Sequence, residues 1–164
     1  TLTHNGYIKR LPTSDFKAQN RGGRGVQGMG VHDDDFIEHL LTTSTHDELL
    51  FFTNVGKVYR MKAYEIPEYG RTAKGIPVIN LLDISADEKI QTVINIPADK
   101  VQTDKEMYLF FITRQGTVKR TSVSEFGNIR KNGLKAITLR DGDELINVLA
   151  TDDSKNIIIG THQG

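Results

Sequence analysis

The sequence predicts an all-β protein made of repeated antiparallel units with about four short strands each, as in β-propellers. Three observations support this prediction. A hairpin motif occurs three times and starts a fourth time, strand-like runs fill the intervals between its copies, and its turn glycine recurs at intervals of 50, 60 and 48 residues. A helical period is weak everywhere, and residues 33–41 are the one helical candidate.

Each hairpin motif has a β-branched or aromatic strand, a short polar turn that ends in glycine, and a second strand that ends in arginine. The turn glycines are Gly6, Gly56 and Gly116, and the arginines are Arg10, Arg60 and Arg120. Glycine supplies the positive φ that a tight hairpin turn requires. Residues 156–164 begin a fourth copy, which stops at its turn glycine.

The arginine of each motif raises a question about the strand that carries it. Arg60 follows Val58 by two residues, so strict alternation places its side chain on the same face as an apolar residue. A bulge, or a strand that ends before the arginine, would resolve this. The sequence leaves both alternatives open.

Further strand-like runs lie between the hairpins, at residues 76–82, 90–96, 135–139 and 145–151. Gly, Asn, Asp and Pro separate these runs, as expected for turns. The repeats therefore extend approximately over residues 1–48, 49–106 and 107–154, with an incomplete copy at 155–164. We expect about three four-stranded blades and the start of a fourth.

Composition excludes several classes of protein. The chain has 21 Lys and Arg against 21 Asp and Glu, which excludes a globally basic histone-like protein and a polyanionic tail. Apolar runs are too short to cross a bilayer, so we expect no membrane contact. Cysteine is absent, which excludes disulfides and thiolate metal sites and fits a cytoplasmic location. Because the first residue is Thr1, we expect a fragment of a longer protein.

Charge is segregated along each repeat although the net charge is zero. Residues 1–31 have five Lys or Arg against one acid, residues 54–80 have five against two, and residues 114–140 have seven against one. Solvated loops would explain any single basic window. Recurrence at matching offsets favours a continuous basic stripe instead, because equivalent positions of neighbouring repeats form one surface. Such a stripe is typical of a nucleic-acid path.

A glycine-arginine loop stands out in the first basic window, with the sequence Gln19-Asn20-Arg21-Gly22-Gly23-Arg24-Gly25. Paired glycines between two arginines let the backbone amides and the guanidinium groups approach a phosphate closely. It is not a P-loop, because the Gly-Lys-Ser/Thr ending is missing. Corresponding loops at residues 69–75 and 128–133 keep basic residues and the closing glycine.

With this loop, the chain resembles the C-terminal domain of bacterial DNA gyrase A. Residues 19–25 are similar to the seven-residue box of that family, Gln-Arg-Arg-Gly-Gly-Lys/Arg-Gly, with Asn20 as the departure. The segments Val58 to Arg60 and Lys74 to Pro77 add to the resemblance. The resemblance implies a β-pinwheel, a propeller-like disc whose blades exchange strands with their neighbours.

The resemblance also implies a function: duplex DNA binds and wraps around the basic rim of the disc. The type IIA topoisomerase then introduces negative supercoils. The DNA-binding residues that it implies are the box, Gln19, Asn20, Arg21, Gly22, Gly23, Arg24 and Gly25, and the basic rim, Lys9, Arg10, Lys57, Arg60, Arg71, Lys74, Arg114, Lys119, Arg120, Arg130, Lys131 and Lys135.

In the parent enzyme, the implied partners are gyrase B and the N-terminal part of gyrase A, in an A2B2 heterotetramer. ATP and Mg²⁺ belong to that holoenzyme, with ATP hydrolysed by gyrase B. For this fragment itself we expect no cofactor and no catalytic site. The DNA-cleaving tyrosine of the family lies upstream, so that role falls to none of the five tyrosines here.

Two alternative functions and a metal site also have some support. The C-terminal domain of the topoisomerase IV protein equivalent to gyrase A shares the fold but typically has a degenerate or missing box. A propeller scaffold for protein partners is favoured only if the basic stripe is broken in space. Acids follow His32 at residues 33–35 and precede His162 at residues 152–153, but consecutive carboxylates in a polar spacer are typical of a solvated turn. We therefore expect no metal.

Overall fold

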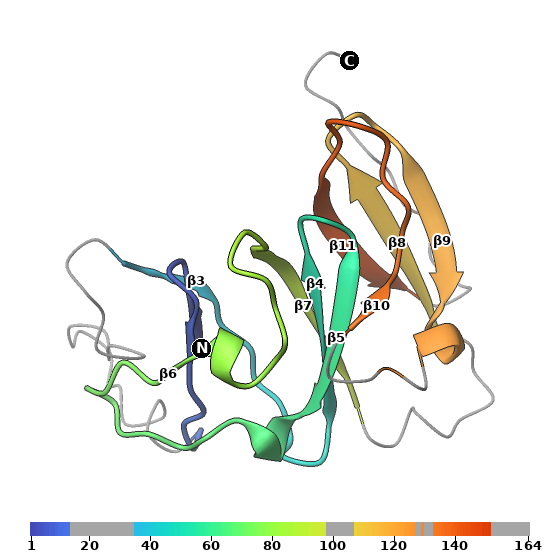
Figure 1. Cartoon of the computed structure of the whole chain (residues 1–164). Coiled ribbons are helices and arrows are strands. Elements are labelled where there is room, and N and C mark those ends of the chain that lie inside the picture. Colours follow the sequence, from blue (N-terminus) through green and yellow to red (C-terminus); the bar gives the residue numbers. More distant parts are fainter. Residues whose placement is uncertain (14–34, 98–106, 127–128, 130–132, 152–164) are drawn as a thin grey trace, which may run out of the picture.

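A computed structural model gives the fold, and it describes residues 1–13, 35–97, 107–126, 129 and 133–151. The described chain forms three antiparallel sheets, which follow one another across Figure 1 from the blue N-terminal strands to the orange and red C-terminal strands. This arrangement confirms the all-β, propeller-like prediction. Among these residues, no helix is both long enough and apolar enough to cross a membrane.

Within the described residues, eleven strands make up the three sheets. The first sheet has the order β3-β1-β2-β6, formed by β3 (Ile37–His39), β1 (Leu2–Thr3), β2 (Tyr7–Ile8) and β6 (Ile76–Pro77). The second has the order β10-β5-β4-β7, formed by β10 (Leu134–Lys135), β5 (Lys57–Lys62), β4 (Glu48–Thr53) and β7 (Ile90–Ile96). The third has the order β11-β8-β9, formed by β11 (Leu145–Thr151), β8 (Tyr108–Thr113) and β9 (Val118–Ser122). Short 3₁₀ helices occur at η1 (Ala63–Glu65), η2 (Val78–Asn80) and η4 (Val123–Phe126).

Neighbouring repeats exchange strands. β6 comes from the second repeat but pairs with β2 of the first sheet, with Ile8 opposite Ile76. β10 comes from the third repeat but pairs with β5 of the second sheet, with Val58 opposite Leu134. Each exchanged strand forms the outer edge of a sheet built mainly from the preceding repeat. The exchange confirms the pinwheel arrangement that the resemblance implied.

The three hairpin turns have the same geometry. Gly6, Gly56 and Gly116 have φ values of 88°, 85° and 91°. The backbone N–H of each donates to the carbonyl of a threonine three residues earlier, at 3.0 Å in every case. Because L-residues rarely adopt this φ, glycine is required at these positions.

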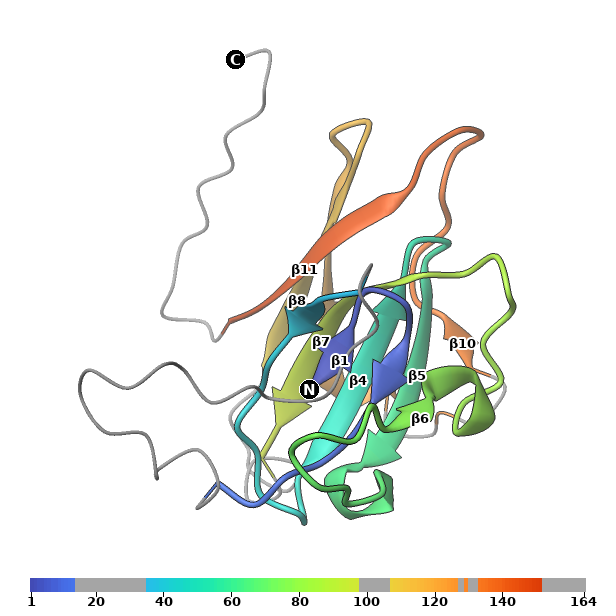
Figure 2. The ribbon, with the colours of Figure 1, turned by 90° about the vertical axis from the view of Figure 1, so that its left-hand side faces the viewer.

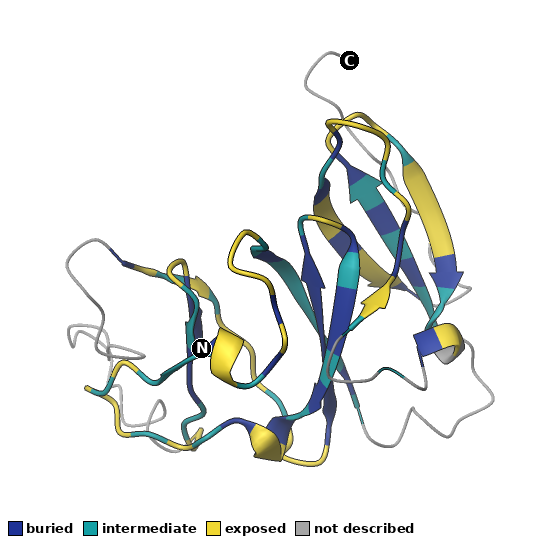
Figure 3. Ribbon diagram, in the orientation of Figure 1, coloured by how far each residue is buried: buried dark blue, intermediate teal, exposed yellow. Residues whose placement is uncertain are grey.

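The central sheet lies between two apolar cores, which explains why all six residues of β4 are buried. Leu49 and Phe51 belong to the core shared with the first sheet, and Leu50 and Phe52 belong to the core shared with the third sheet. Successive side chains of a strand point to opposite faces, so both faces of this sheet are covered. Figure 3 shows the contrast between the buried β4 and the largely exposed β9.

The question of the hairpin arginines has a different answer in each repeat. β2 ends at Ile8, so Arg10 lies outside the strand. β5 continues through Arg60, whose Nη2 lies 2.8 Å from Oε1 of the buried Glu48. This ion pair compensates the guanidinium charge at the end of an apolar face. In β9 the exposed Arg120 lies over the ring of Tyr108, 4.3 Å from its centroid.

Several predicted elements need correction. The helical candidate over residues 33–41 is wrong, because Ile37–His39 forms β3 and pairs with β1. In residues 76–82 only Ile76–Pro77 is a strand, and η2 follows Pro77. Of residues 135–139 only Lys135 is in a strand, because β10 covers Leu134–Lys135. The predictions for residues 90–96 and 145–151 are confirmed by β7 and β11.

Candidate nucleic-acid interface

Basic residues are distributed unevenly over the sheets. Every lysine and arginine that lies within a described strand is in β5, β9 or β10. β3, β7 and β11, which form the opposite edges of the three sheets, contain neither residue. In Figure 2, β6 and β10 lie on the right, and β7 and β11 lie to their left. Within the strands, positive charge therefore collects toward one edge of the second and third sheets.

Two lysines face each other where the exchanged strand joins the second sheet. Lys57 of β5 is directly opposite Lys135 of β10, so both side chains are on the same face. Like charges placed opposite one another are destabilising. No described carboxylate forms an ion pair with either lysine. The pair is therefore suited to an anion that would relieve the repulsion.

A second basic group lies on the loop that precedes β6. Arg71 and Lys74 are both exposed there. Arg10 holds the start of this loop, because its Nε donates to the Ile66 carbonyl at 3.0 Å and its backbone N–H donates to the Pro67 carbonyl at 3.1 Å. The Lys74 ammonium lies 5.4 Å from the centre of the Tyr7 ring. Cations of the second repeat thus lie beside the first sheet.

Lys9 does not occupy the position that was predicted for it. Its side chain is only 1% exposed, and Nζ donates to the carbonyls of Gly70, Arg71 and Ala73 at 2.6, 3.0 and 2.8 Å. An ammonium group has three N–H donors, so all of them are used. The prediction of Lys9 as a direct phosphate contact is therefore corrected. Alternation along the hairpin strand could not reveal a loop that covers it from another repeat.

The third sheet carries its basic residues on the edge strand β9. Lys119 and Arg120 are exposed there, and Nζ of Lys119 is 3.4 Å from the Ala136 carbonyl. Arg114, in the hairpin turn before β9, is 63% exposed, and its Nη2 lies 2.6 Å from Oε2 of Glu144. Arg60 is likewise paired with an acid, Glu48, which Lys62 also contacts at 3.2 Å. Arg60 and Arg114 are therefore partly neutralised, unlike Lys57 and Lys135.

Other predicted site residues lie outside the described residues. These are the whole box, Gln19, Asn20, Arg21, Gly22, Gly23, Arg24 and Gly25, and the rim residues Arg130 and Lys131. The same is true of His32, His162 and the acids at 33–34 and 152–153. Within the part of the chain that is described, no cluster of three His, Cys, Asp or Glu could hold a metal ion.

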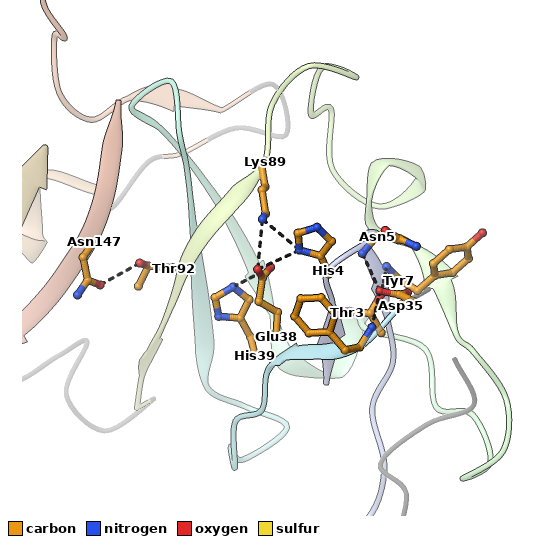
Figure 4. A network of polar contacts seen from close by, with 11 residues as sticks. Thr3, His4, Asn5, Tyr7, Asp35, Glu38, His39, Lys89, Thr92 and Asn147 are labelled. Carbon is orange, nitrogen blue, oxygen red and sulfur yellow. Dashed lines mark hydrogen bonds and ion pairs between the residues drawn. The ribbon is translucent and has the colours of Figure 1, made fainter. Parts of the chain in front are cut away.

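Two aspartates organise the hairpin turns, a role that was not predicted from the sequence. Asp35 accepts hydrogen bonds from the backbone N–H of Asn5 at 2.9 Å and of Phe36 at 2.8 Å (Figure 4). Asp143 accepts the equivalent bonds from Gln115 and Glu144, both at 2.9 Å. Asp35 and Asp143 lie 29 and 27 residues after the turn glycines Gly6 and Gly116. This recurrence of acids in the spacers is the sequence pattern that could have indicated their role.

Polar contacts also connect neighbouring sheets on the edge without lysine or arginine in its strands. Lys89, from the loop before β7, lies 3.2 Å from Oε1 of Glu38 and 3.2 Å from Nδ1 of His4 (Figure 4). The hydroxyl of Thr92 in β7 donates to the side-chain carbonyl of Asn147 in β11 at 3.2 Å. These contacts hold adjacent sheets together at the edge formed by β3, β7 and β11. The candidate interface is therefore the outer edge, formed by β6, β10 and β9.

Comparison with known proteins gives consistent results. A family model described as the DNA gyrase C-terminal domain, a β-propeller, matches residues 1–44, 47–97 and 108–152. DNA gyrase A of Streptococcus pneumoniae is 65% identical over the whole chain, and that of Halalkalibacterium halodurans is 59% identical. The chain spans about a fifth of the length of these relatives, 20% and 19% respectively.

Solved structures show the same likeness. A DNA gyrase A C-terminal domain superposes with a TM-score of 0.70 at 32% identity, covering 93% of this chain and 47% of that one. The C-terminal domain of a DNA topoisomerase IV superposes with a TM-score of 0.73 at 29% identity, covering 92% of this chain and 44% of that one. Sequence and fold agree, and the chain belongs to the DNA gyrase C-terminal domain family.

Proposed function

We propose that the chain binds duplex DNA along the basic outer edge of its sheets and bends it around them. The observation that carries this proposal is the uneven distribution of charge: lysine and arginine occur in β5, β9 and β10 and are absent from the opposite edge strands β3, β7 and β11. Beside the first sheet, whose strands contain neither residue, the loop before β6 adds the exposed Arg71 and Lys74. Cations at the same edge of successive sheets offer repeated contacts to a phosphate backbone.

Binding of this kind depends on phosphates more than on bases. Exposed lysines and arginines on strands and short loops contact the sugar-phosphate backbone, which positions the duplex but carries no sequence information. The described edge has no α-helix that would enter the major groove. The proposed binding is therefore weakly selective for sequence.

Within a complete enzyme, we propose that this bending contributes to negative supercoiling. The relatives at 59% to 65% identity are DNA gyrase A proteins, and the chain corresponds to about a fifth of them. The proposed partners are duplex DNA, the remainder of gyrase A, and a gyrase B protein that hydrolyses ATP with Mg²⁺. The box at residues 19–25 is proposed to secure one end of the DNA path.

A topoisomerase IV role is the second candidate, because such a C-terminal domain superposes well at 29% identity. The gyrase role is favoured, because the whole chain aligns with DNA gyrase A at up to 65% identity. A supercoiling assay of the complete protein with its ATPase partner separates the two. Introduction of negative supercoils supports the gyrase role, and relaxation or decatenation alone supports the alternative.

Duplex length tests whether the basic groups act together. A duplex long enough to reach all three sheets is expected to bind more tightly than one that covers a single sheet, in gel shifts at two salt concentrations. Equal affinity for both lengths would contradict a continuous path. An absence of DNA binding at both salt concentrations would favour a scaffold for protein partners.

A further inference from the structure

Lys9 is the one buried lysine among the described residues, and it has no acidic partner in its hydrogen bonds. Three backbone carbonyls surround its ammonium group, from Gly70, Arg71 and Ala73. Burying a charged group is costly unless hydrogen bonds satisfy it, and here all three N–H donors are satisfied. Lys9 therefore binds the loop that covers it, and its ammonium group has no N–H donor left for another partner.

That loop carries two of the exposed cations of the candidate interface. Arg71 is bound through its own carbonyl, so its backbone position is fixed while its side chain remains exposed. Lys74 follows directly after Ala73, whose carbonyl is also bound. The loop belongs to the second repeat, whereas Lys9 follows β2 in the first. The contact thus places cations of one repeat on the sheet of its neighbour.

In the second sheet too, the residue three positions after the turn glycine contacts the following repeat. Tyr59 lies three residues after the turn glycine, as Lys9 does, and it is fully buried. Gly133, which closes the corresponding loop of the third repeat, packs so closely on Tyr59 that a Cβ there would lie 2.7 Å from ring atom Cε1. The third equivalent, Lys119, is exposed. In the first two sheets, this position therefore contacts the segment that precedes the exchanged strand of the next repeat.

We propose that Lys9 is a positioning residue for DNA binding, which holds residues 70–73 so that Arg71 and Lys74 face the phosphate backbone. The inference rests on the proposed function, since it assigns a role within the same interface. Lys9 contributes without touching DNA. Its loss should therefore weaken binding through Arg71 and Lys74, and only while those two residues are present.

The test compares Lys9→Met with Lys119→Met, which removes the same charge from the equivalent exposed position. DNA affinity is measured by fluorescence anisotropy over a series of salt concentrations. Each lost phosphate contact makes the slope of log K against log salt less steep by about 0.9. We expect a change of about 1.8 for K9M, from two contacts, and at most about 0.9 for K119M.

A second background separates positioning from direct contact. In R71A/K74A the slope should already be less steep by about 1.8, and adding K9M should change it no further. A further decrease of about 0.9 would mean that Lys9 binds a phosphate itself and would overturn the inference. An unchanged slope for K9M in the otherwise wild-type chain would overturn it as well.

Limited trypsin digestion gives a readout that needs no DNA. K9M should accelerate cleavage after Arg71 and Lys74 several-fold, whereas K119M should leave these rates unchanged. If K9M does not fold, K9R provides the test, because one guanidinium cannot reproduce three converging bonds although it keeps the charge. Wild-type affinity and cleavage rates in K9R would refute the proposal. Failure of the wild-type chain to bind DNA would refute the proposed function, while the digestion would still report on the loop.

Discussion

At the scale of single residues, burial and partners separate cations that look equivalent in the sequence. Lys9, Lys57 and Arg60 all follow a turn glycine within four residues. Lys9 is bound by three carbonyls, Arg60 is paired with Glu48, and Lys57 faces another lysine. A side chain that faces a like charge has most to gain from a phosphate. The Lys57–Lys135 pair is therefore the part of the interface where stability and binding are opposed.

Replacing both lysines tests this opposition. K57Q/K135Q keeps long polar side chains but removes the repulsion between the strands. We expect unfolding stability to stay the same or rise by roughly 0.2–1 kcal/mol, because like charges directly opposite are destabilising. DNA affinity should fall, with a salt slope less steep by about 1.8. Urea unfolding and anisotropy measure the two effects. A loss of stability with unchanged affinity would show that the pair has a structural role instead.

The aspartates of the hairpin turns predict a pH dependence of stability. Burial opposes ionisation of Asp35 and Asp143, but hydrogen bonds from neighbouring threonines and backbone amides outweigh it and lower the pKa of each carboxyl. A lowered pKa in the folded state means that the ionised carboxylate stabilises the fold above its unfolded pKa of about 3.9. This stabilisation is lost as the pH falls through the folded-state value.

We therefore expect D143N to be less stable than the wild type at pH 7, and the difference to shrink below about pH 4. Urea unfolding at pH 7 and at successively lower pH values measures it. At low pH, Asp143 of the wild type is protonated and no longer provides the stabilisation by its ionised carboxylate, which D143N lacks at every pH. A difference in stability that stayed constant down to the lowest pH would contradict this explanation.

At the scale of elements, close backbone approach distinguishes Gly75, which precedes the exchanged strand β6, from Gly116 in a hairpin turn. Gly75 has φ 90°, and a Cβ there would collide with the carbonyl oxygen of Ile8. Gly116 has φ 91°, but a Cβ there would meet nothing within 4 Å. Both positions need the left-handed conformation, whereas only Gly75 lies tightly against a neighbouring strand. The two glycines therefore make a matched pair.

Alanine substitutions at these two positions should differ in their effect on stability. G116A is expected to destabilise the chain by about 1–2 kcal/mol, because a residue with a Cβ must adopt a left-handed conformation there. G75A should destabilise it further, because strand β6 must also move away from β2. Urea unfolding of both variants provides the measurement. Equal losses would show that the exchanged strand can shift without cost.

The elements that could be predicted from the sequence are those formed by local residues. The hairpins and the strands β7 and β11 followed from turn glycines and apolar runs. The elements that could not be predicted depend on distant partners. Ile37–His39 becomes a strand because it pairs with β1. Leu134–Lys135 stops after two residues because Lys135 is opposite Lys57, the first residue of β5, and the next two N–H groups donate to the turn carbonyl of Gly56.

At the scale of the whole molecule, the sequence indicated that basic windows recur but not which of their residues reach the surface. The exposure of Arg71, Lys74 and Lys119 was predicted, and the burial of Lys9 was not, because a loop from the next repeat covers it. The absence of lysine and arginine from β3, β7 and β11 was visible in the sequence, but it acquired meaning only from their place at one edge of the sheets.

The box predicts a separation of binding from supercoiling in the complete enzyme. R21A/R24A removes two cations among many, so DNA binding and relaxation should persist. Bending 20–30 base pairs through a large angle costs roughly 1–6 kcal/mol, and contacts at the ends of the path must hold the duplex there. Most negative supercoiling should therefore be lost, as measured on relaxed plasmid with the ATPase partner. Wild-type supercoiling by this variant would mean that these arginines take no part in the wrap.

The central claim is that phosphates bind along a basic edge shared by successive sheets, and the salt dependence of DNA affinity tests it most directly. The measurement is the association constant of the chain for one duplex that reaches all three sheets, over a range of salt concentrations. If the chain contacts about five phosphates, log K should fall with log salt at a slope of about −4 to −5. A flat salt response would contradict the claim.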